Sequence, residues 1–231
     1  ATDDLHLDIA PGEIHAIIGP NGAGKTTLIS QLSGEQRPDK GRIKFTGRDI
    51  TSLSMPARAT LGLARSFQIT SIFSDFSTLD NVALAVQAHA GHSFHFWRPA
   101  NKAATLRGPA LHALERIGLG KRADEPAANL SHGEQRQLEI AMALATEPAV
   151  MLLDEPMAGM GRDETANMVE ILQGLKSRHT IVLIEHDMDA VFALADRITV
   201  LVYGRAIATG RPEEIRANDA VRAAYLGTGD A

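Results

Sequence analysis

The chain has 231 residues, of which 44% are hydrophobic and 22% charged, with a formal net charge of −5 and no cysteine. This composition is close to the globular average, so it excludes disordered, collagen-like and coiled-coil chains, and no apolar run reaches the ~18 residues of a membrane-spanning helix. The negative charge argues against a dedicated nucleic-acid binder, and the absence of cysteine excludes disulfides, thiolate metal sites and cysteine nucleophiles.

The first part of the chain alternates between short strands and helices. Alternating or continuous apolar residues predict strands over 5–9, 13–18, 41–45 and 64–68. Helices are predicted over 25–33, after a glycine-rich turn, and over 56–61. Pro56 suits the first turn of the second helix.

The pattern changes between residues 78 and 130, where strand signals disappear and helical periodicity takes over. One helix is expected from about Ala83 to near Gly91, and another over 103–117. Beyond this block the alternation resumes. Helices are predicted over 134–145, 163–176 and 212–226, and strands over 150–153, 180–184, 198–203 and 206–209.

Apolar strands that alternate with helices indicate a parallel sheet covered by helices on both faces. We therefore expect an α/β fold in a single domain over residues 1–231. Residues 78–130 are expected to form an inserted helical subdomain, and a small antiparallel β element is expected near the N-terminus.

A phosphate-binding loop is predicted between the strand 13–18 and the helix 25–33, where the chain matches G-x-x-x-x-G-K-[ST]. Its glycines let backbone N–H groups converge on phosphates, and the following helix N-terminus favours an anion. Lys25 would reach the β- and γ-phosphates, and the Thr26 hydroxyl would bind Mg²⁺. The predicted nucleotide-binding residues here are Gly19, Pro20, Asn21, Gly22, Ala23, Gly24, Lys25, Thr26 and Thr27.

Two acids, Asp154 and Glu155, follow the apolar strand 150–153. Ligands of an open α/β sheet bind beyond the carboxyl ends of its strands, so these acids and the phosphate loop can face one site. Asp154 would hold Mg²⁺, and Glu155 would orient or deprotonate an attacking water. This arrangement favours hydrolysis of the nucleotide over transfer to a bound acceptor.

The segment 130–135, LSHGEQ, opens a helix in which Ser131 and Glu134 can form a capping box. The same segment resembles the LSGGQ signature of the ATP-binding cassette (ABC) ATPases. Gln68 resembles the family's Q-loop glutamine, His186 its switch histidine, and residues 157–161 its D-loop. Five motifs in the family's order identify the chain as a member, which implies a P-loop NTPase core of the RecA-like type.

The resemblance also implies a mechanism in which two cassettes form a head-to-tail dimer around two ATP molecules. Ser131, Gly133 and Glu134 would bind the nucleotide held by the other subunit. His186 would contact the γ-phosphate, and Gln68 would sense Mg²⁺ or the water. The implied cofactors are ATP and Mg²⁺, with Thr26, Gln68 and Asp154 around the metal.

The chain departs from the family pattern at three places. His132 stands where the signature has glycine, and Gly161 stands where the D-loop usually has aspartate. No aromatic residue precedes Gly19, although family members place an adenine-stacking aromatic after a first strand. We therefore expect that first strand to be missing from this chain.

Residues 62–68, 157–160, 184–188 and 222–227 resemble the ATPase subunits of branched-chain amino acid importers. The implied partners are multi-spanning permease subunits, a second ABC ATPase in a homo- or heterodimer and, indirectly, a periplasmic or extracellular substrate-binding protein; no nucleic acid is expected. The implied location is the cytoplasmic face of the inner membrane. Urea or amide importers, lipopolysaccharide exporters and ABC ATPases that never touch a membrane remain alternatives.

The helical block contains an aromatic patch over 94–97, and His89, His92 and His95 recur every three residues. The patch could cap the core of the subdomain or contact a permease. The histidines could suggest a metal site, but without carboxylate or thiol partners in the sequence we expect them to be solvated.

Overall fold

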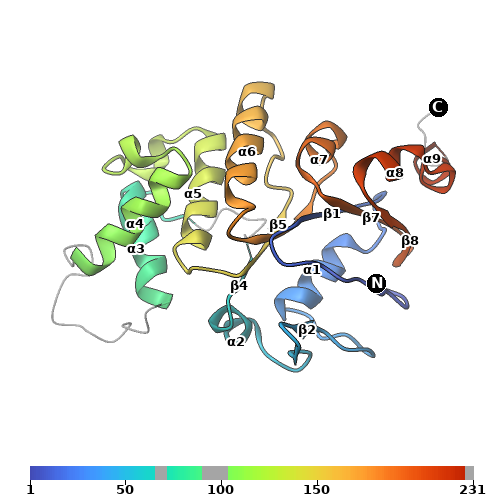
Figure 1. The fold of residues 1–231 in the computed structure, drawn as a ribbon. Coiled ribbons are helices and arrows are strands. Elements are labelled where there is room, and N and C mark those ends of the chain that lie inside the picture. Colours follow the sequence, from blue (N-terminus) through green and yellow to red (C-terminus); the bar gives the residue numbers. More distant parts are fainter. Residues whose placement is uncertain (66–71, 90–103, 227–231) are drawn as a thin grey trace.

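The computed structural model describes residues 1–65, 72–89 and 104–226 (Figure 1). The strands are β1 (Ile14–Ile18), β2 (Lys44–Phe45), β3 (Arg48–Asp49), β4 (Leu63–Arg65), β5 (Val150–Asp154), β6 (Thr180–Ile184), β7 (Arg197–Val202) and β8 (Arg205–Gly210). The α-helices are α1 (Lys25–Ser33), α2 (Met55–Thr60), α3 (Thr78–His89), α4 (Ala104–Arg116), α5 (His132–Leu144), α6 (Arg162–Leu175), α7 (Met188–Leu194), α8 (Pro212–Ala217) and α9 (Asp219–Leu226).

Six strands form one sheet in the order β4-β5-β6-β1-β7-β8. All neighbouring strands run parallel except β7 and β8, which are antiparallel. The predicted α/β fold with a parallel sheet is therefore confirmed. The strand β1 lies in the interior of the sheet, so its carboxyl end opens between the ends of β6 and β7.

Successive strand residues point to opposite sides of the sheet, so both of its faces carry apolar side chains. Helices cover both faces. Ile17 of β1 and Val182 of β6 pack in one apolar cluster with Leu28 of α1. Leu183, the next residue of β6, packs on the other face in a cluster that includes Leu172 of α6. Figure 1 shows α1 on one side of the sheet and α6 and α7 on the other.

The helices α3, α4 and α5 lie together at one end of the molecule (Figure 1). Val82 of α3, Leu114 of α4 and Leu138 of α5 are fully buried in the same cluster as Leu183. The apolar face of the helical block is thus continuous with the core of the sheet. No helix in the described part of the chain is long and apolar enough to span a membrane.

The structure corrects several predicted elements. Residues 5–9 form no strand, although Leu5, Leu7 and Ile9 do pack against the cluster around Ile17. The alternation of apolar and polar residues in this segment reflects burial of one side of an extended chain. Such burial does not require a neighbouring strand that forms backbone hydrogen bonds. The predicted strand 41–45 shortens to β2, which pairs with β3 as the small antiparallel element.

The helical tail predicted over 212–226 is divided into α8 and α9 at Asn218. The Asn218 side chain accepts hydrogen bonds from the N–H groups of Ala220 and Val221, so it ends one helix and caps the next. The short helix α7 was not predicted; Asp187 caps it through the N–H groups of Asp189 and Ala190. Gln68, His92, His95 and the aromatic patch lie outside the described residues.

Candidate functional site

Three loops meet at the carboxyl edge of the parallel strands β5, β6 and β1. They carry Lys25 after β1, Asp154 and Glu155 at the end of β5, and His186 after β6. The Lys25 ammonium interacts with the carboxylates of both Asp154 and Glu155, and His186 Nδ1 lies 3.9 Å from Glu155 Oε1. The fold therefore brings together four of the predicted site residues.

The loop between β1 and α1 presents the N-terminus of α1 to this edge. Gly24 is the N-cap residue of α1 and has φ +104°, in the left-handed region that favours glycine. Because glycine has no side chain to cap the helix, the first N–H groups of α1, at Lys25, Thr26 and Thr27, point outward without a capping group. Such an end binds anions such as phosphate.

The Lys25 ammonium is folded back over its own loop. Its Nζ donates hydrogen bonds to the carbonyl oxygens of Gly19, at 2.6 Å, and Pro20, at 3.2 Å. Burial lowers the Lys25 pKa, while the Glu155 and Asp154 carboxylates oppose that shift. A phosphate could replace the two carbonyls as the partner of this cation.

Asp154 is almost fully buried and is held by an arginine that the sequence analysis did not single out. Its Oδ2 lies 3.5 Å from Arg65 Nη2, and Arg65 also pairs with Glu35. Burial raises the Asp154 pKa, whereas Arg65 lowers it. Arg65 ends β4, directly before residues 66–71, so it links the Asp154 carboxylate to the strand that leads toward Gln68.

Glu155 has an unusual backbone conformation for a residue with a side chain. Its φ is +50°, and its N–H donates to the carbonyl of Ile184 at 2.9 Å. A non-glycine residue in this region costs about 1–3 kcal/mol, and such strain clusters at functional sites. Its side chain is 34% exposed, so the carboxylate is accessible to water.

A third acid at this edge, Glu185, was missed by the sequence analysis. It lies between Ile184 and His186, and its side chain is only 1% exposed. Burial raises the Glu185 pKa, and hydrogen bonds from three backbone N–H groups oppose that shift. Nothing in the local sequence distinguishes this glutamate from a solvated loop acid.

The segment 130–135 caps α5 as its sequence suggests. The N–H of Glu134 donates to Ser131 Oγ at 3.2 Å, and the N–H of Ser131 donates to Glu134 Oε2 at 2.8 Å, so the predicted capping box is confirmed. Ser131 Oγ also donates to Glu164 Oε1 of α6 at 3.3 Å. A Cβ on Gly133 would lie 2.7 Å from that same oxygen.

Both residues that depart from the signature and D-loop patterns lie at contacts between the segment 130–135 and the start of α6. His132 lies against Gly159, where an added Cβ would be 3.4 Å from the imidazole Cε1. Gly161 is the N-cap of α6, and its N–H donates to Glu164 Oε2 at 3.3 Å. Glu164 therefore connects the start of α5 to the start of α6.

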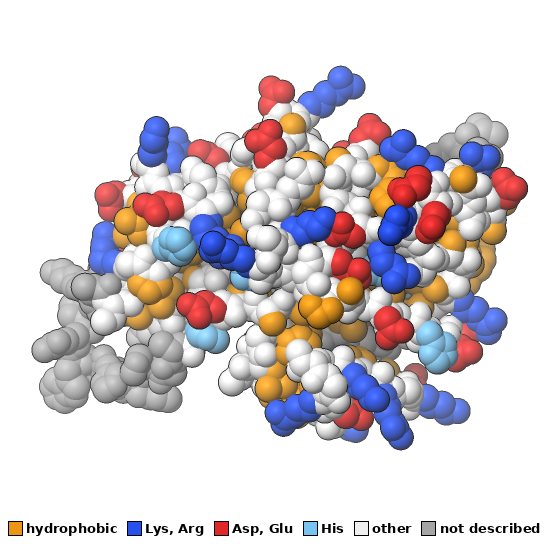
Figure 2. Space-filling model, viewed as in Figure 1, with side chains coloured by type: hydrophobic (Ala, Val, Ile, Leu, Met, Phe, Trp, Pro, Cys, Tyr) orange, Lys and Arg blue, Asp and Glu red, His pale blue; other side chains and the backbone are white. Residues whose placement is uncertain are grey.

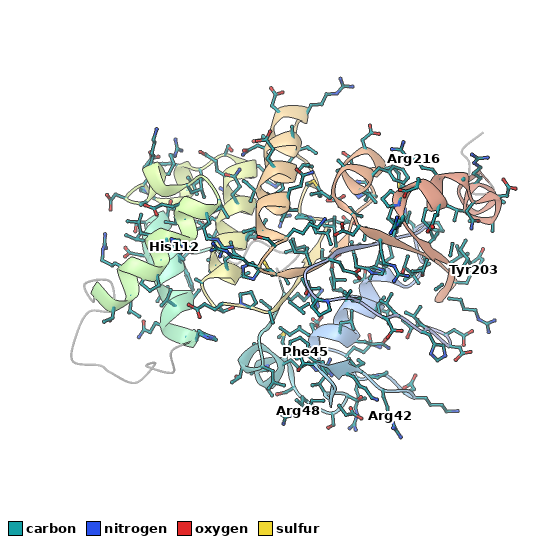
Figure 3. The ribbon with its side chains drawn as sticks, viewed as in Figure 1. Arg42, Phe45, Arg48, His112, Tyr203 and Arg216 are labelled. Atoms are coloured by element: carbon teal, nitrogen blue, oxygen red, sulfur yellow. The ribbon has the colours of Figure 1, made fainter. Side chains whose placement is uncertain are left out.

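The remaining predicted residues are spread around the same edge. Asn21, Gly22 and Thr26 are exposed, whereas Ala23 is buried beneath the loop. The Ala23 carbonyl accepts a hydrogen bond from Gly204 N–H at 2.8 Å, which fastens the loop to the β7–β8 turn. Tyr203, in that turn, is 88% exposed at the tip of the hairpin (Figure 3).

Comparisons with known proteins extend over nearly the whole chain. The family described as ABC transporter matches residues 2–158, and that described as branched-chain amino acid ATP-binding cassette transporter matches residues 207–231. The chain is similar to the high-affinity branched-chain amino acid transport ATP-binding protein LivG of Escherichia coli strain K12, with 38% identity over 98% of this chain and 92% of LivG. It is 36% identical to the corresponding protein BraF of Pseudomonas aeruginosa, over 98% and 92% of the two chains.

Among solved structures, the chain is similar to the ADP conformation of an ATP-binding cassette of an ABC transporter. The TM-score is 0.87 with 30% identity, and the match covers 98% of this chain and 92% of the other. The resemblance therefore includes the arrangement of the strands and helices as well as the sequence.

Proposed function

Because the chain belongs to the family of ABC transporter ATPases, we propose that it is the ATP-hydrolysing subunit of an importer for branched-chain or other hydrophobic amino acids. The observation that carries this proposal is the convergence of Lys25, Asp154, Glu155 and His186 at one edge of a parallel sheet. The choice of cargo is supported by the names of LivG and BraF.

The site residues take the roles that their chemistry allows. Lys25 and the N–H groups at the start of α1 would hold the phosphates of ATP. Glu155 would orient or deprotonate the attacking water, since its carboxylate is accessible at the end of β5. His186 would contact the γ-phosphate from the neighbouring loop, and Gln68 would complete the site.

Thr26, Asp154 and Gln68 are proposed to surround Mg²⁺. Oxygen donors suit this ion, which commonly binds through one or two carboxylates and substrate phosphates. The described residues contain no cluster of three or more His, Cys, Asp or Glu side chains that could hold a metal ion. The proposed Mg²⁺ site therefore depends on the phosphates of ATP for further oxygen ligands. Mg²⁺ would neutralise charge that develops on the phosphates.

A complete site is proposed to need two subunits. Ser131 and the Gly133 backbone lie at the N-terminus of α5, which suits an anion, and would bind the γ-phosphate held by the phosphate loop of the other subunit. Glu134 would contact the same nucleotide. The second subunit would be a copy of this chain or another ABC ATPase.

Residues 78–130 are proposed to form a helical subdomain that docks on permease subunits. Phe73 and Phe76, just before α3, are 54% and 46% exposed, and their rings lie 5.4 Å apart. An exposed aromatic pair is suited to a protein contact. The chain would thereby sit at the cytoplasmic face of the inner membrane, with a substrate-binding protein reached through the permeases.

Nucleic acid is not a proposed partner. Figure 2 shows both signs of charge distributed over the visible face, with one group of Lys and Arg side chains over β2 and β3. Arg42, Lys44 and Arg48 are exposed there, while the whole chain carries a net charge of −5. A nucleic-acid binder generally has a more basic overall charge.

Replacing Glu155 by glutamine tests the ATPase mechanism. Glu155→Gln keeps the side-chain shape but removes the base, so ATP turnover should fall by about 100-fold or more while ATP binding persists. Dimers should then accumulate with ATP, as measured by light scattering after size-exclusion chromatography. Glu213→Gln on the exposed surface of α8 is the matched control. Rapid hydrolysis by Glu155→Gln would contradict the assigned role.

A pull-down from native membranes, with partners identified by mass spectrometry, tests the transport function separately. Recovery of multi-spanning permeases would support an importer, and the ligand of a co-purifying binding protein would identify the cargo. Recovery of ribosomes or DNA-repair factors alone would contradict the transport function. It would not contradict the proposed ATPase activity.

A further inference from the structure

Glu185 is a buried carboxylate that the hydrolysis mechanism above does not use. Its side chain is 1% exposed, at the point where β6 ends and the loop carrying His186 begins. A buried carboxylate is costly unless its oxygens accept hydrogen bonds. Its partners therefore indicate what this acid holds together.

The two carboxylate oxygens of Glu185 bind two different loops. Oε1 accepts a hydrogen bond from the N–H of Met157 at 2.9 Å. Oε2 accepts from the N–H of His186 at 3.0 Å and, more weakly, from that of Asp187 at 3.5 Å. One side chain thus joins the start of the segment 157–161 to the loop of the switch histidine.

Both proposed catalytic groups lie next to this bridge. Glu155 is two residues before Met157, and its own N–H is bonded to Ile184 O, one residue before Glu185. His186 Nδ1 lies 3.8 Å from Glu185 Oε2 and 3.9 Å from Glu155 Oε1. The separation between Glu155 and His186 is therefore fixed by groups that Glu185 ties down.

We propose that Glu185 is a positioning residue that holds Glu155 and His186 at the spacing needed for ATP hydrolysis; this inference rests on the proposed function. Only a carboxylate of this length offers an acceptor to both loops. An amide has one acceptor oxygen, and its NH₂ group would face a backbone N–H donor on one side or the other.

Glu185→Gln is the direct test, because it preserves the shape and removes one acceptor. The kcat for ATP should fall about 10- to 100-fold, the range expected when reacting groups are misplaced, with KM and ATP affinity nearly unchanged. Amide hydrogen exchange at Met157 or His186 should also accelerate about tenfold, as expected for loss of one hydrogen bond. A merely structural residue would not produce this division between kcat and KM.

Glu13→Gln is a matched control, because Glu13 is also nearly buried and hydrogen-bonded. It lies directly before β1, at the edge of the sheet opposite to the proposed site. This variant should leave kcat and the exchange of Met157 and His186 unchanged. If Glu185→Gln does not fold, Glu185→Asp is used, which keeps the charge but is too short to reach both loops, and the same division is expected.

An active wild-type enzyme whose Glu185→Gln variant keeps its kcat would overturn the positioning role. The role would also be overturned if fast exchange at Met157 in the wild-type protein showed the bridge to be open. Absence of ATPase activity from the wild type would contradict the proposed function instead. Slow exchange at Met157 would still support the bridge in that case, so the two failures are distinguishable.

Discussion

Gly133 lies where the carboxylate of Glu164 leaves no room for a side chain. A Cβ there would be 2.7 Å from Glu164 Oε1, and that carboxylate is held by Ser131 Oγ and Gly161 N–H. A side chain at this position would therefore have to displace the Glu164 carboxylate from its contacts at the starts of α5 and α6.

Replacing Gly133 by alanine should destabilise the protein by about 1 kcal/mol, because overpacking displaces a tethered carboxylate. Adding Glu164→Ala should relieve that cost, which would appear as a non-additive double-mutant cycle in urea denaturation. Additive free energies of unfolding would show that the contact is not the cause. ATPase activity should stay low in the double variant, since the added Cβ would still crowd the nucleotide contact proposed at this glycine.

Single residues also show where sequence reasoning stops. Lys25, Asp154 and Glu155 were predictable because each belongs to a local pattern whose chemistry is recognisable. Arg65 and Glu185 were not, because their roles come from partners far away in sequence: Asp154 for Arg65 and Met157 for Glu185. Such roles exist only once the strand ends are side by side.

At the scale of elements, a buried arginine joins α1 to α2. Arg58 of α2 is 1% exposed, and its Nη1 donates to the carbonyls of Gln31 and Leu32 at 2.6 and 2.7 Å. Its Nε and Nη2 donate to the carbonyls of Leu53 and Thr51. The guanidinium thereby satisfies the last carbonyls of α1, which a helix cannot pair by itself.

Arg58→Met should lower the free energy of unfolding by about 2–3 kcal/mol, because the charge-assisted hydrogen bonds to the carbonyls of Gln31, Leu32, Leu53 and Thr51 are lost. Arg48→Met, on the exposed β3 strand shown in Figure 3, is the control and should cost little. Chemical denaturation of both variants measures the difference. Equal stabilities would mean that water replaces the guanidinium.

Within the sheet, His15 links β1 to β7 through a buried polar network. Its Nδ1 lies 2.9 Å from Glu13 Oε1 and its Nε2 lies 2.8 Å from Thr199 Oγ1, which in turn lies 2.9 Å from Thr209 Oγ1 of β8. Burial lowers the His15 pKa, with Glu13 opposing the shift. Burial therefore favours the neutral form of this imidazole in the folded protein.

Acidification below about pH 6.5 should destabilise the protein, because unfolded His15 gains a proton there that the folded form does not bind. The loss is at most about 1.4 kcal/mol per pH unit for one such group. His15→Gln should reduce this slope in urea denaturation, whereas His6→Gln on an exposed side chain should not. His179, whose pKa burial also lowers, contributes a slope of the same sign, whereas Asp154 and Glu185, whose pKa burial raises, contribute a slope of the opposite sign at lower pH.

Elements were predicted well where start and stop signals are local. The predicted helix 25–33 matches α1 because a glycine turn precedes it and Gly34 ends it. The predicted strand 5–9 failed because its alternation records burial of Leu5, Leu7 and Ile9 against a core cluster, while pairing depends on a neighbouring strand. The break at Asn218 required a side-chain cap that periodicity does not reveal.

At the scale of the whole molecule, the proposed dimer predicts complementation between two inactive variants. Lys25→Ala removes the cation proposed to bind phosphate in one half of each site, and Ser131→Ala removes the donor proposed for the other half. Mixed dimers would contain one intact site, so an equal mixture should recover about a quarter of wild-type ATPase activity. No recovery in a mixture proven to contain mixed dimers would contradict the head-to-tail arrangement.

The position of β1 has a consequence for synthesis on the ribosome. Among the strands of the described residues β1 comes first along the chain, all five of its residues are buried, and its neighbours β6 and β7 begin only at Thr180 and Arg197. At 5–20 residues per second, this apolar strand would wait roughly 10–35 s for both partners. The nascent β1 is therefore exposed to misassociation until both partners have been made, and holdase chaperones that bind apolar segments should raise the yield of folded protein.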